Sequence, residues 1–392
     1  MRNGTDKVLL IVTLLLLLIG AVMIYSSTSV ITSLAANKNL TPFYYFKRHL
    51  FTMMIGFFFM YLAYRMPQEL ISKLSVPLMI IAFVLLLAVF IPKVGLTVGG
   101  ARRWIRLWPS TFQPSELAKI SMVIFLARYL SMPYFRRDSF VSFLIPICVM
   151  AVFQIVFLIQ PDFGATINLG ILSIIMLILA GTRLRYVMSL AILAIPVAIK
   201  LAMEPYRLKR ILAFLNPWGD PQGSGFQLIQ SFIALGSGGL TGVGLGEGKQ
   251  KLSFLPEIHT DFIFSLIGEE LGFIGTMTVV ILFLIIFIRG ISIAKRNHSG
   301  FSYYLSFGLT MMIVLQALIN FAVATGVVPT KGLPLPFISY GGSSLLINMI
   351  AIGILLNLSK GERPLKVIDT KALIIEKKKA VLTVYGRGSS IS

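Results

Sequence analysis

The sequence is poor in the residues that build disulfides and metal clusters. Its 392 residues contain a single cysteine, Cys148, which lies within an apolar run. An intrachain disulfide and a cysteine metal cluster are therefore excluded. The three histidines, His49, His259 and His298, are too scattered along the chain to indicate a histidine metal site.

Acidic residues are also scarce, at 15 Asp and Glu against 35 Lys and Arg, which gives a formal net charge of +20. A surplus of this size indicates anionic partners such as lipid headgroups or phosphates. Extended polar stretches are few, because 56% of the residues are hydrophobic and the mean hydropathy is +0.87. The chain is too apolar for a soluble domain of this length, and we expect no nucleic-acid partner.

The apolar residues are concentrated in long runs, which predicts an all-α integral membrane protein. We predict about ten transmembrane helices, each near the roughly 20 residues that a bilayer requires. The first run is too long for a signal peptide, so we expect it to remain as a helix. The predicted spans cover 8–33, 49–64, 76–92, 117–132, 141–160, 164–181, 186–203, 262–288, 301–325 and 338–359.

The distribution of Lys and Arg predicts that both termini are cytoplasmic, because basic residues favour the inner ends of spans. An even number of spans agrees with this orientation. Residues 1–362 then form one polytopic membrane domain, with a large outer loop at 204–260 between the seventh and eighth helices. Residues 363–392 form a basic cytoplasmic tail.

Two predicted outer loops carry cations where few are expected. The first contains Arg102 and Arg103, and the large outer loop contains Arg207, Arg210 and Lys251. Anionic lipid in the outer leaflet accounts for one or two such residues, and less readily for two clusters on different loops. We therefore favour a pocket on the outer face for an anionic ligand that the membrane holds.

Asp261 follows Thr260 at the entrance of the eighth predicted helix. A carboxylate at that point of a membrane helix is unusual and costly to desolvate. One interpretation is that Asp261 or Thr260 caps the helix in the headgroup layer. The other is that Asp261 belongs to a functional site, and this stretch alone favours neither.

Four further ionisable residues lie inside predicted spans. Glu116 and Lys119 are three positions apart, so they share a helix face and are expected to form a structural pair. Glu269 and Glu270 follow Asp261 by about two helical turns, roughly 12 Å, which is too far to contact a ligand group held at Asp261. We predict that at least one of these two acids faces the bundle interior and is paired, with Lys119 as a candidate partner.

Three outer segments have distinctive patterns. Asp162, in the short turn QPDFG, is expected to cap the following helix, although it could also bind a cation or hold an outer arginine. The segment 205–215 is typical of an amphipathic helix at the membrane interface, with breakers after it. The segment 326–348, which contains Ser343, is expected to be a broken segment that lines a cavity.

The glycine-rich segment 234–248 matches neither a phosphate-binding loop of the Walker type nor a dinucleotide fingerprint. Two interpretations remain for it. It is either a flexible outer loop or a main chain that approaches a ligand or another helix closely.

Five motifs keep the order and spacing found in the SEDS family of polytopic membrane proteins, which includes FtsW, RodA and SpoVE. The chain resembles this family over nearly all of its length, up to about Glu362. No single motif is decisive, but five in order make a chance resemblance very unlikely. The motifs are GGARRWI with QPSELAK, QPDFG, NPWGDPQGSGFQ, GLGEGKQKLSFLPEIHTDFIFSLIGEELG and PTKGLPLPFISYGGSS.

The resemblance implies a ten-helix SEDS bundle that polymerises peptidoglycan glycan strands from lipid II at the outer face of the cytoplasmic membrane. The aspartate of the family's HTDFIF motif is its essential residue, and Asp261 occupies that position. Asp261 would act as the general base, and direct displacement would form a β-1,4 link with inversion and release undecaprenyl pyrophosphate. The outer cations, together with Glu257, His259 and Ser343, would bind the substrate.

The resemblance also implies partners and a location. A class B penicillin-binding transpeptidase and other membrane proteins of the division machinery are the expected protein partners, at the division septum. Several motifs resemble the cell-division member of the family more than the elongation member. An elongation polymerase, a lipid II flippase and a scaffold for division enzymes remain as alternatives. The residues establish no cofactor; a divalent cation, Mg²⁺ or Mn²⁺, is an open candidate with unknown ligands.

Overall fold

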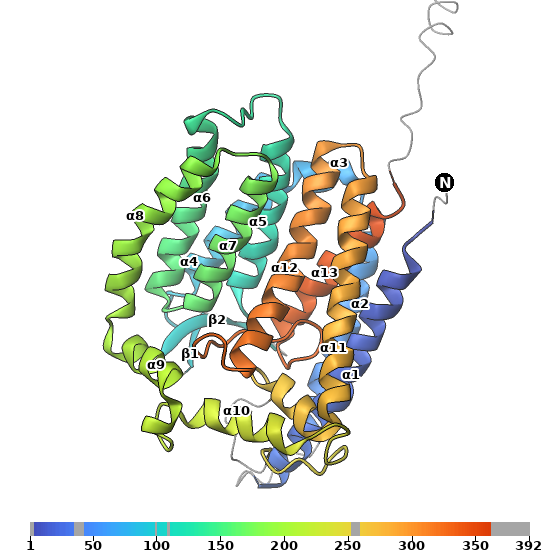
Figure 1. Cartoon of the computed structure of the whole chain (residues 1–392). Helices are drawn as coiled ribbons and strands as arrows, with labels where there is room; N and C mark the ends of the chain where they lie inside the picture. Colours follow the sequence, from blue (N-terminus) through green and yellow to red (C-terminus); the bar gives the residue numbers. More distant parts are fainter. Residues whose placement is uncertain (1–3, 35–42, 99, 108–109, 252–258, 362–392) are drawn as a thin grey trace, which may run out of the picture. The chain divides into compact units, whose positions relative to one another are not determined.

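The structure is a computed structural model that describes residues 4–34, 43–98, 100–107, 110–251 and 259–361. Within these ranges, ten helices of 14 residues or more run side by side (Figure 1). They match the predicted spans to within a few residues, except that the eighth continues to Arg296. They are α1 (Lys7–Leu34), α2 (Tyr44–Arg65), α4 (Ser75–Ala88), α5 (Pro114–Ser131), α6 (Phe140–Ile159), α7 (Phe163–Leu179), α8 (Leu184–Ala202), α11 (Ile263–Arg296), α12 (Gly300–Ala324) and α13 (Gly342–Leu358).

Judged by length and composition alone, five of the described helices are long and apolar enough to cross a membrane: α1, α6, α8, α11 and α12. The helices α4, α7 and α13 are shorter apolar helices. The helices pack against one another in the pairs α2 with α13, α11 with α12, and α5 with α12. α5 is buried on most sides, whereas α8 exposes apolar side chains such as Leu193 and Ile192. An apolar face of this kind suits contact with lipid.

One end of the bundle carries the irregular elements, and we call it the sheet end. Strands β1 (Gly95–Val98), β2 (Ala101–Leu107) and β3 (Ser110–Phe112) form an antiparallel sheet in that order. Helices α9 (Pro205–Leu215) and α10 (Phe226–Ser237) lie at this end, joined by the short turn η1 (Pro217–Gly219). The short helix α3 (Gln68–Lys73) and the start of α1 lie at the opposite end (Figure 1).

The prediction of an all-α chain is wrong for the segment 95–112, which forms this sheet. The sequence of β2, ARRWIRL, does not alternate between apolar and cationic residues, so no period of two indicated a strand there. The large outer loop also contains more structure than predicted. The amphipathic helix at 205–215 is confirmed as α9, but α10 was not predicted, because the glycines beyond it indicated a loop.

Helix α11 is broken at Gly272, whose φ of 66° and ψ of −163° are not helical. A side chain at this left-handed φ would be strained, so glycine suits the position. The glycine-rich segment 239–244 supplies main-chain hydrogen bonds across the break, which confirms the second interpretation of that segment. The bonds join Val243 N to Glu269 O, Gly244 N to Glu270 O, Phe273 N to Gly239 O and Ile274 N to Leu240 O, at 2.9, 3.1, 2.9 and 3.2 Å.

The break separates the first two turns of α11 from the rest of the helix. The residues before Gly272 follow Asp261 directly, so they form a short helical segment between the predicted site and the long remainder. Helix ends inside a membrane must have their backbone groups satisfied by other parts of the protein. Segment 239–244 meets this need, and it fixes the orientation of the short segment.

Candidate active site

Asp261 lies at the sheet end, immediately before α11. The helix has Phe262 as its N-cap residue and no capping hydrogen bond from a side chain. The interpretation of Asp261 or Thr260 as a helix cap is therefore wrong. Asp261 is half-buried, so the Asp261 side chain is partly shielded yet still accessible from outside the bundle.

Three consecutive carbonyl oxygens fix the main chain around Asp261. Each of them accepts a hydrogen bond from α12 or from the loop between α12 and α13, residues 325–341. The donors and acceptors are Tyr340 N to His259 O at 2.8 Å, Ser339 Oγ to Thr260 O, and Asn320 Nδ2 to Asp261 O at 2.9 Å. A reacting group held by its own main chain keeps a fixed position without using its side chain for the purpose.

The 325–341 loop is itself anchored inside the bundle. Asn320 also donates to the carbonyl of Leu333 at 2.8 Å, and Gln316 donates to the carbonyl of Pro334 at 2.8 Å. The side chain of Phe337 is 1% exposed. The prediction of a broken segment that lines a cavity is confirmed for this loop. Its Gly332 lies so close to Asp261 that a Cβ there would be 2.9 Å from Asp261 Oδ2.

Arg210 of α9 reaches the same loop, because its Nη1 donates to the carbonyl of Thr330 at 3.1 Å. Lys331 follows, and burial lowers the pKa of its ammonium group. Gly332 comes next and lies against the Asp261 carboxylate. Three consecutive residues therefore connect a predicted phosphate-binding arginine to the predicted base.

Arg207, one turn earlier on α9, packs differently. Its guanidinium lies 3.5 Å from the centre of the Phe163 ring, and its Nη1 donates to the carbonyl of Leu201 at 2.8 Å. Burial lowers the pKa of Arg207, and the charge of Glu204 opposes this shift. Arg207 thus links α9 to the start of α7 and the end of α8.

The two arginines of β2 that were predicted to bind the substrate, Arg102 and Arg103, make hydrogen bonds away from Asp261. Arg102 is exposed and donates from Nε to the hydroxyl of Thr97 at 3.0 Å. Arg103 donates to the carbonyl oxygens of Gln160 and Pro161, in the turn between α6 and α7. The predicted cluster of outer arginines is therefore distributed over a strand and a helix.

The prediction that Lys251 binds the substrate is wrong. Lys251 is 3% exposed, and its ammonium group forms a buried ion pair. Its Nζ lies 2.9 Å from Glu270 Oε1, and it also donates to Ser26 Oγ at 3.2 Å and to the carbonyl of Gly246. Ser26 donates to both oxygens of Glu270 at 2.7 Å. Sequence alone placed Lys251 in an exposed basic loop and did not reveal that α1 and α11 enclose it.

The predicted pairing of the membrane acids is confirmed, and the proposed partner Lys119 is wrong. Glu270 pairs with Lys251, and Glu269 accepts from the main-chain N–H groups of Lys249 at 2.7 Å and Gln250 at 3.2 Å. Lys119 pairs instead with Glu116 at 2.9 Å, as the spacing of three predicted. Its Nζ also donates to Gln316 at 2.6 Å.

Asp162 caps α7, as predicted, by accepting from the N–H of Ala165 at 3.1 Å. It also accepts from Gln113 Nε2 at 3.1 Å and from the hydroxyl of Ser115 at 3.4 Å. Gln113 is the N-cap residue of α5, but its side chain makes no capping bond. Asp162 thus joins the first turns of α5 and α7 at the sheet end.

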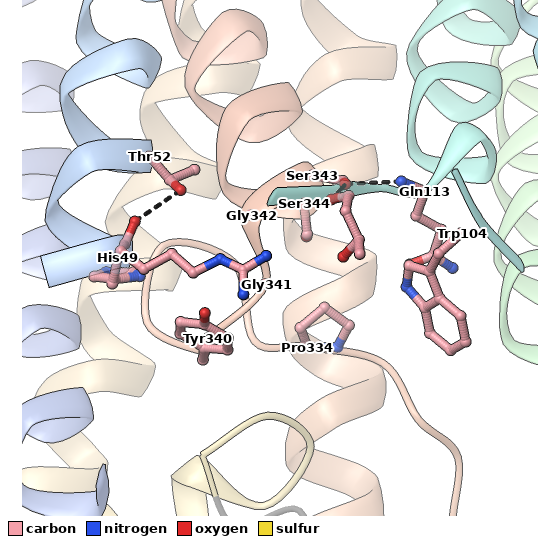
Figure 2. Close-up of a pocket in the computed structure, with 12 residues that line it drawn as sticks. His49, Thr52, Trp104, Gln113, Pro334, Tyr340, Gly341, Gly342, Ser343 and Ser344 are labelled. Carbon is pink, nitrogen blue, oxygen red and sulfur yellow. Dashed lines mark hydrogen bonds between the residues drawn. The ribbon is translucent and has the colours of Figure 1, made fainter. Parts of the chain in front are cut away.

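A cavity of about 250 Å³ lies beside the 325–341 loop. Figure 2 shows Tyr340 and Pro334 on one side of it, and Ser343 and Gln113, which share a hydrogen bond of 2.8 Å, on the other. Ser343 is the one predicted substrate residue among the residues that line it. Glu257 lies outside the described residues. Within the described residues, no three His, Cys, Asp or Glu side chains gather as metal ligands, so we assign no metal site.

The family model described as "Cell cycle protein", which covers FtsW, RodA and SpoVE, matches residues 6–364. The chain belongs to this family. Among known relatives, the probable peptidoglycan glycosyltransferase FtsW of Geobacter sp. (strain M18) is 44% identical over 359 residues, 91% of this chain and 97% of the relative. Stage V sporulation protein E of Bacillus subtilis (strain 168) is 40% identical over 366 residues, 92% of this chain and 99% of the relative.

Two solved structures share the fold of this chain. A chain from a peptidoglycan synthase complex that coordinates polymerization and crosslinking aligns with a TM-score of 0.73 and 28% identity, over 91% of this chain and 97% of that chain. RodA of Thermus thermophilus aligns with a TM-score of 0.65 and 24% identity, over 91% of this chain and 96% of that chain.

Several site residues of this FtsW/RodA/SpoVE-family chain were not predicted from its sequence. Arg48 and His49, at the start of α2, line the cavity, as does Gln113. Asn320 and Gln316 fix the 325–341 loop from within α12. The charged start of the second span was a usable signal, because it adds another cation to the predicted outer face. No sequence pattern identified the amides of Asn320 and Gln316 as site residues, since a lone amide in an apolar run has many structural uses.

Proposed function

We propose that this chain is a peptidoglycan glycosyltransferase that polymerises glycan strands from lipid II. The observation that carries this proposal is the fixed position of Asp261, whose main chain is hydrogen-bonded to α12 and flanked by carbonyls tied to the 325–341 loop. Arg210 of α9 contacts the same loop, and Lys331 belongs to it. The names of the relatives, which are 40–44% identical over nine-tenths of the chain, support the same reaction.

Asp261 acts as the general base in this mechanism. A sugar hydroxyl is a poor nucleophile, so a base must remove its proton during attack. The 4-hydroxyl oxygen of the acceptor attacks C1 of the donor sugar while the Asp261 carboxylate takes the proton. The bond between C1 and the pyrophosphate oxygen breaks, and its electron pair leaves with undecaprenyl pyrophosphate. Displacement from an α-linked donor inverts C1 and forms a β-1,4 link.

The cations of α9 stabilise the departing pyrophosphate. Negative charge grows on the leaving group in the transition state, and a prearranged cation lowers the barrier most when it lies where that charge develops. Arg210 is the best placed of the predicted residues, because it contacts the loop that also touches Asp261. An arginine can grip a phosphate group through two parallel hydrogen bonds.

The sheet end faces outward from the cytoplasmic membrane in this proposal. The opposite end carries basic residues in its turns and helix ends, among them Arg136, Arg137, Arg183 and Lys295, as the positive-inside rule requires of a cytoplasmic face. Both termini are then cytoplasmic. The pyrophosphate-linked sugar of lipid II reaches Asp261 from the outer headgroup layer, while its lipid chain stays in the bilayer.

The protein partner we propose is a class B penicillin-binding transpeptidase at the division septum, together with other membrane proteins of the division machinery. Crosslinking must follow polymerisation, and one structural neighbour comes from a complex that coordinates the two steps. The relative named FtsW, which is 44% identical over 91% of this chain, favours the division role over elongation.

The transporter alternative depended on ionisable residues along a path through the membrane. Glu116 with Lys119, and Glu270 with Lys251, are instead buried ion pairs, and Glu269 holds two main-chain N–H groups. These groups stabilise the packing of helices and loops. No feature of the described residues favours transport over glycosyl transfer.

The decisive experiment is glycan polymerisation from purified lipid II by the purified protein, alone and with its cognate class B transpeptidase. We expect polymer that a muramidase degrades, and a strongly reduced amount of it with the Asp261→Asn variant. Absence of polymer under both conditions, together with transfer of lipid II across vesicle bilayers, would contradict the proposal and support a flippase.

A further inference from the structure

The cavity beside the 325–341 loop is built from three separate parts of the chain. The start of α2 contributes Arg48, His49 and Thr52, and the sheet region contributes Trp104 and Gln113. The third part is the end of the 325–341 loop and the first turn of α13. The cavity therefore lies at the sheet end, where the proposed reaction takes place, and not between the long helices.

The lining of this cavity suits an anion. Twelve residues line it, and no carboxylate is among them. Arg48 brings a positive charge, and the hydroxyls of Ser343 and Ser344 lie at the N-terminus of α13. The first turn of a helix presents N–H groups without intrahelical partners and a partial positive charge, which favour phosphate. Gly341, the N-cap residue, supplies no side-chain acceptor for these groups.

Two buried nitrogens at the cavity lack hydrogen-bond partners among the described residues. They are Nε of Arg48 and Nε2 of His49, and the His49 side chain is 2% exposed. Buried polar groups in folded proteins nearly always have a partner. The His49 ring lies 6.3 Å from the ring of Tyr340, which also lines the cavity. These nitrogens are therefore placed to meet a ligand, independently of the α13 N-terminus.

The proposed reaction requires a second anion site, since both of its substrates are lipid-linked pyrophosphates. The donor loses its pyrophosphate, and the acceptor keeps its own throughout the step. The residues around Arg210 provide for one of these groups. The cavity lies close to the same reacting centre. Tyr340 lines it, and the main-chain N–H of Tyr340 donates to the carbonyl of His259, two residues before Asp261.

We propose that this cavity binds the pyrophosphate of the second lipid-linked substrate through Arg48, His49 and the first turn of α13. The proposal rests on the proposed function, from which the need for two such sites follows. Arg48 forms charge-assisted hydrogen bonds to the phosphate oxygens, while the lipid chain extends into the bilayer. The other substrate has its pyrophosphate beside Arg210, so the two headgroups lie on either side of the 325–341 loop.

The test measures binding of farnesyl pyrophosphate to the full-length protein in nanodiscs by isothermal titration calorimetry. We expect two sites in the wild type, and one of them weakened about tenfold or more in Arg48→Gln, through loss of a charge-assisted bond. Arg48→Lys should keep part of the affinity. Arg106→Gln is the matched control, because Arg106 is an exposed arginine of β2 outside the cavity, and both sites should persist.

Inorganic pyrophosphate provides the second arm of the titration and separates a lipid headgroup from a free phosphate. Weaker binding than that of farnesyl pyrophosphate at the Arg48-dependent site supports a lipid-linked ligand. A site that takes inorganic pyrophosphate and excludes farnesyl pyrophosphate overturns the proposal. Equal stoichiometry and affinity in wild type and Arg48→Gln overturns it as well.

A measurement on the wild type makes the test independent of variant folding. Phenylglyoxal modifies accessible arginines, and mass spectrometry quantifies each site. Farnesyl pyrophosphate should protect Arg48 and leave Arg106 reactive; equal modification of Arg48 with and without the lipid contradicts the proposal. Binding that depends on Arg48 in a protein that polymerises nothing would refute the proposed function alone. Polymerisation with no Arg48-dependent binding would refute this inference alone.

Discussion

Asp261, Glu269 and Glu270 follow one another within ten residues, yet the protein holds them in different ways. The two glutamates are 1–2% exposed and bind through their carboxylates to Lys251, Ser26 and main-chain N–H groups. Asp261 is half-buried, and its carbonyl oxygen accepts the bond that fixes it to α12. The glutamates stabilise the packing through their side chains. Asp261 is held in place through its main chain.

This comparison separates effects on activity from effects on stability. Removing charge from Asp261 leaves the three carbonyl bonds of 259–261 in place. Removing charge from Glu269 or Glu270 weakens the bonds that attach residues 249–251 to α11, and in Glu270 it removes the ion pair with Lys251.

Asp261→Asn should reduce polymerisation of lipid II by about 10³-fold, within the range that a general base contributes. The amide keeps the shape of the carboxylate but cannot take the proton. The thermal unfolding temperature should stay near that of the wild type, because the main-chain bonds remain. Glu247→Gln, at an exposed acid of the same outer loop, is the control and should polymerise normally. A wild-type rate for Asp261→Asn would show that another group is the base.

Glu270→Gln should lower the free energy of unfolding by about 3 kcal/mol, since it leaves the buried Lys251 without its carboxylate. Activity per folded molecule should fall much less. The measurement is thermal unfolding in detergent alongside polymerisation normalised to folded protein. Adding Lys251→Met to Glu270→Gln should recover part of the loss, because the unpaired charge is removed. A stable but inactive Glu270→Gln protein would place this acid in the reaction.

The contrast between the two acid types also explains what sequence could predict. The helices follow from long apolar runs, and the Glu116–Lys119 pair follows from a spacing of three on one helix. The pair of Lys251 with Glu270 and Ser26 joins segments up to 244 positions apart, and local spacing carries no information about such a contact. Lys251 was therefore predicted to bind the substrate, whereas in the structure it forms a buried ion pair with Glu270.

The site was predictable in its reacting residue and less so in its surroundings. Asp261 was recognisable from a motif, and its place before α11 is confirmed. The loop geometry depends on Asn320 and Gln316, whose amides bond to main-chain oxygens that sequence cannot locate. The sheet at 95–112 was missed because ten strong helical signals dominated the interpretation of a short polar segment.

Glu269→Gln should destabilise the protein less than Glu270→Gln, by about 1–2 kcal/mol. Its partners are the main-chain N–H groups of Lys249 and Gln250, and an amide oxygen can still accept one of these bonds. Glu269→Leu removes both acceptors and should cost more. Thermal unfolding of the three variants in the same detergent gives the order. If Glu269→Gln is less stable than Glu270→Gln, the ion pair of Glu270 stabilises the protein less than the main-chain bonds of Glu269, and the prediction is wrong.

The smallest effects concern the outer arginines, and they test whether the Asp261 side of the site extends to α9. Arg210→Ala should lower the use of limiting lipid II by about tenfold, the value of one charge-assisted hydrogen bond, and Arg210→Lys should recover part of it. Arg102→Ala should have a smaller effect, since exposed Arg102 contacts Thr97 and no residue of the loop that touches Asp261. Initial polymerisation rates at several lipid II concentrations distinguish the two variants. Equal losses of activity in the two variants would show that Arg102 of β2 also binds the departing pyrophosphate, which would then lie between the sheet and α9.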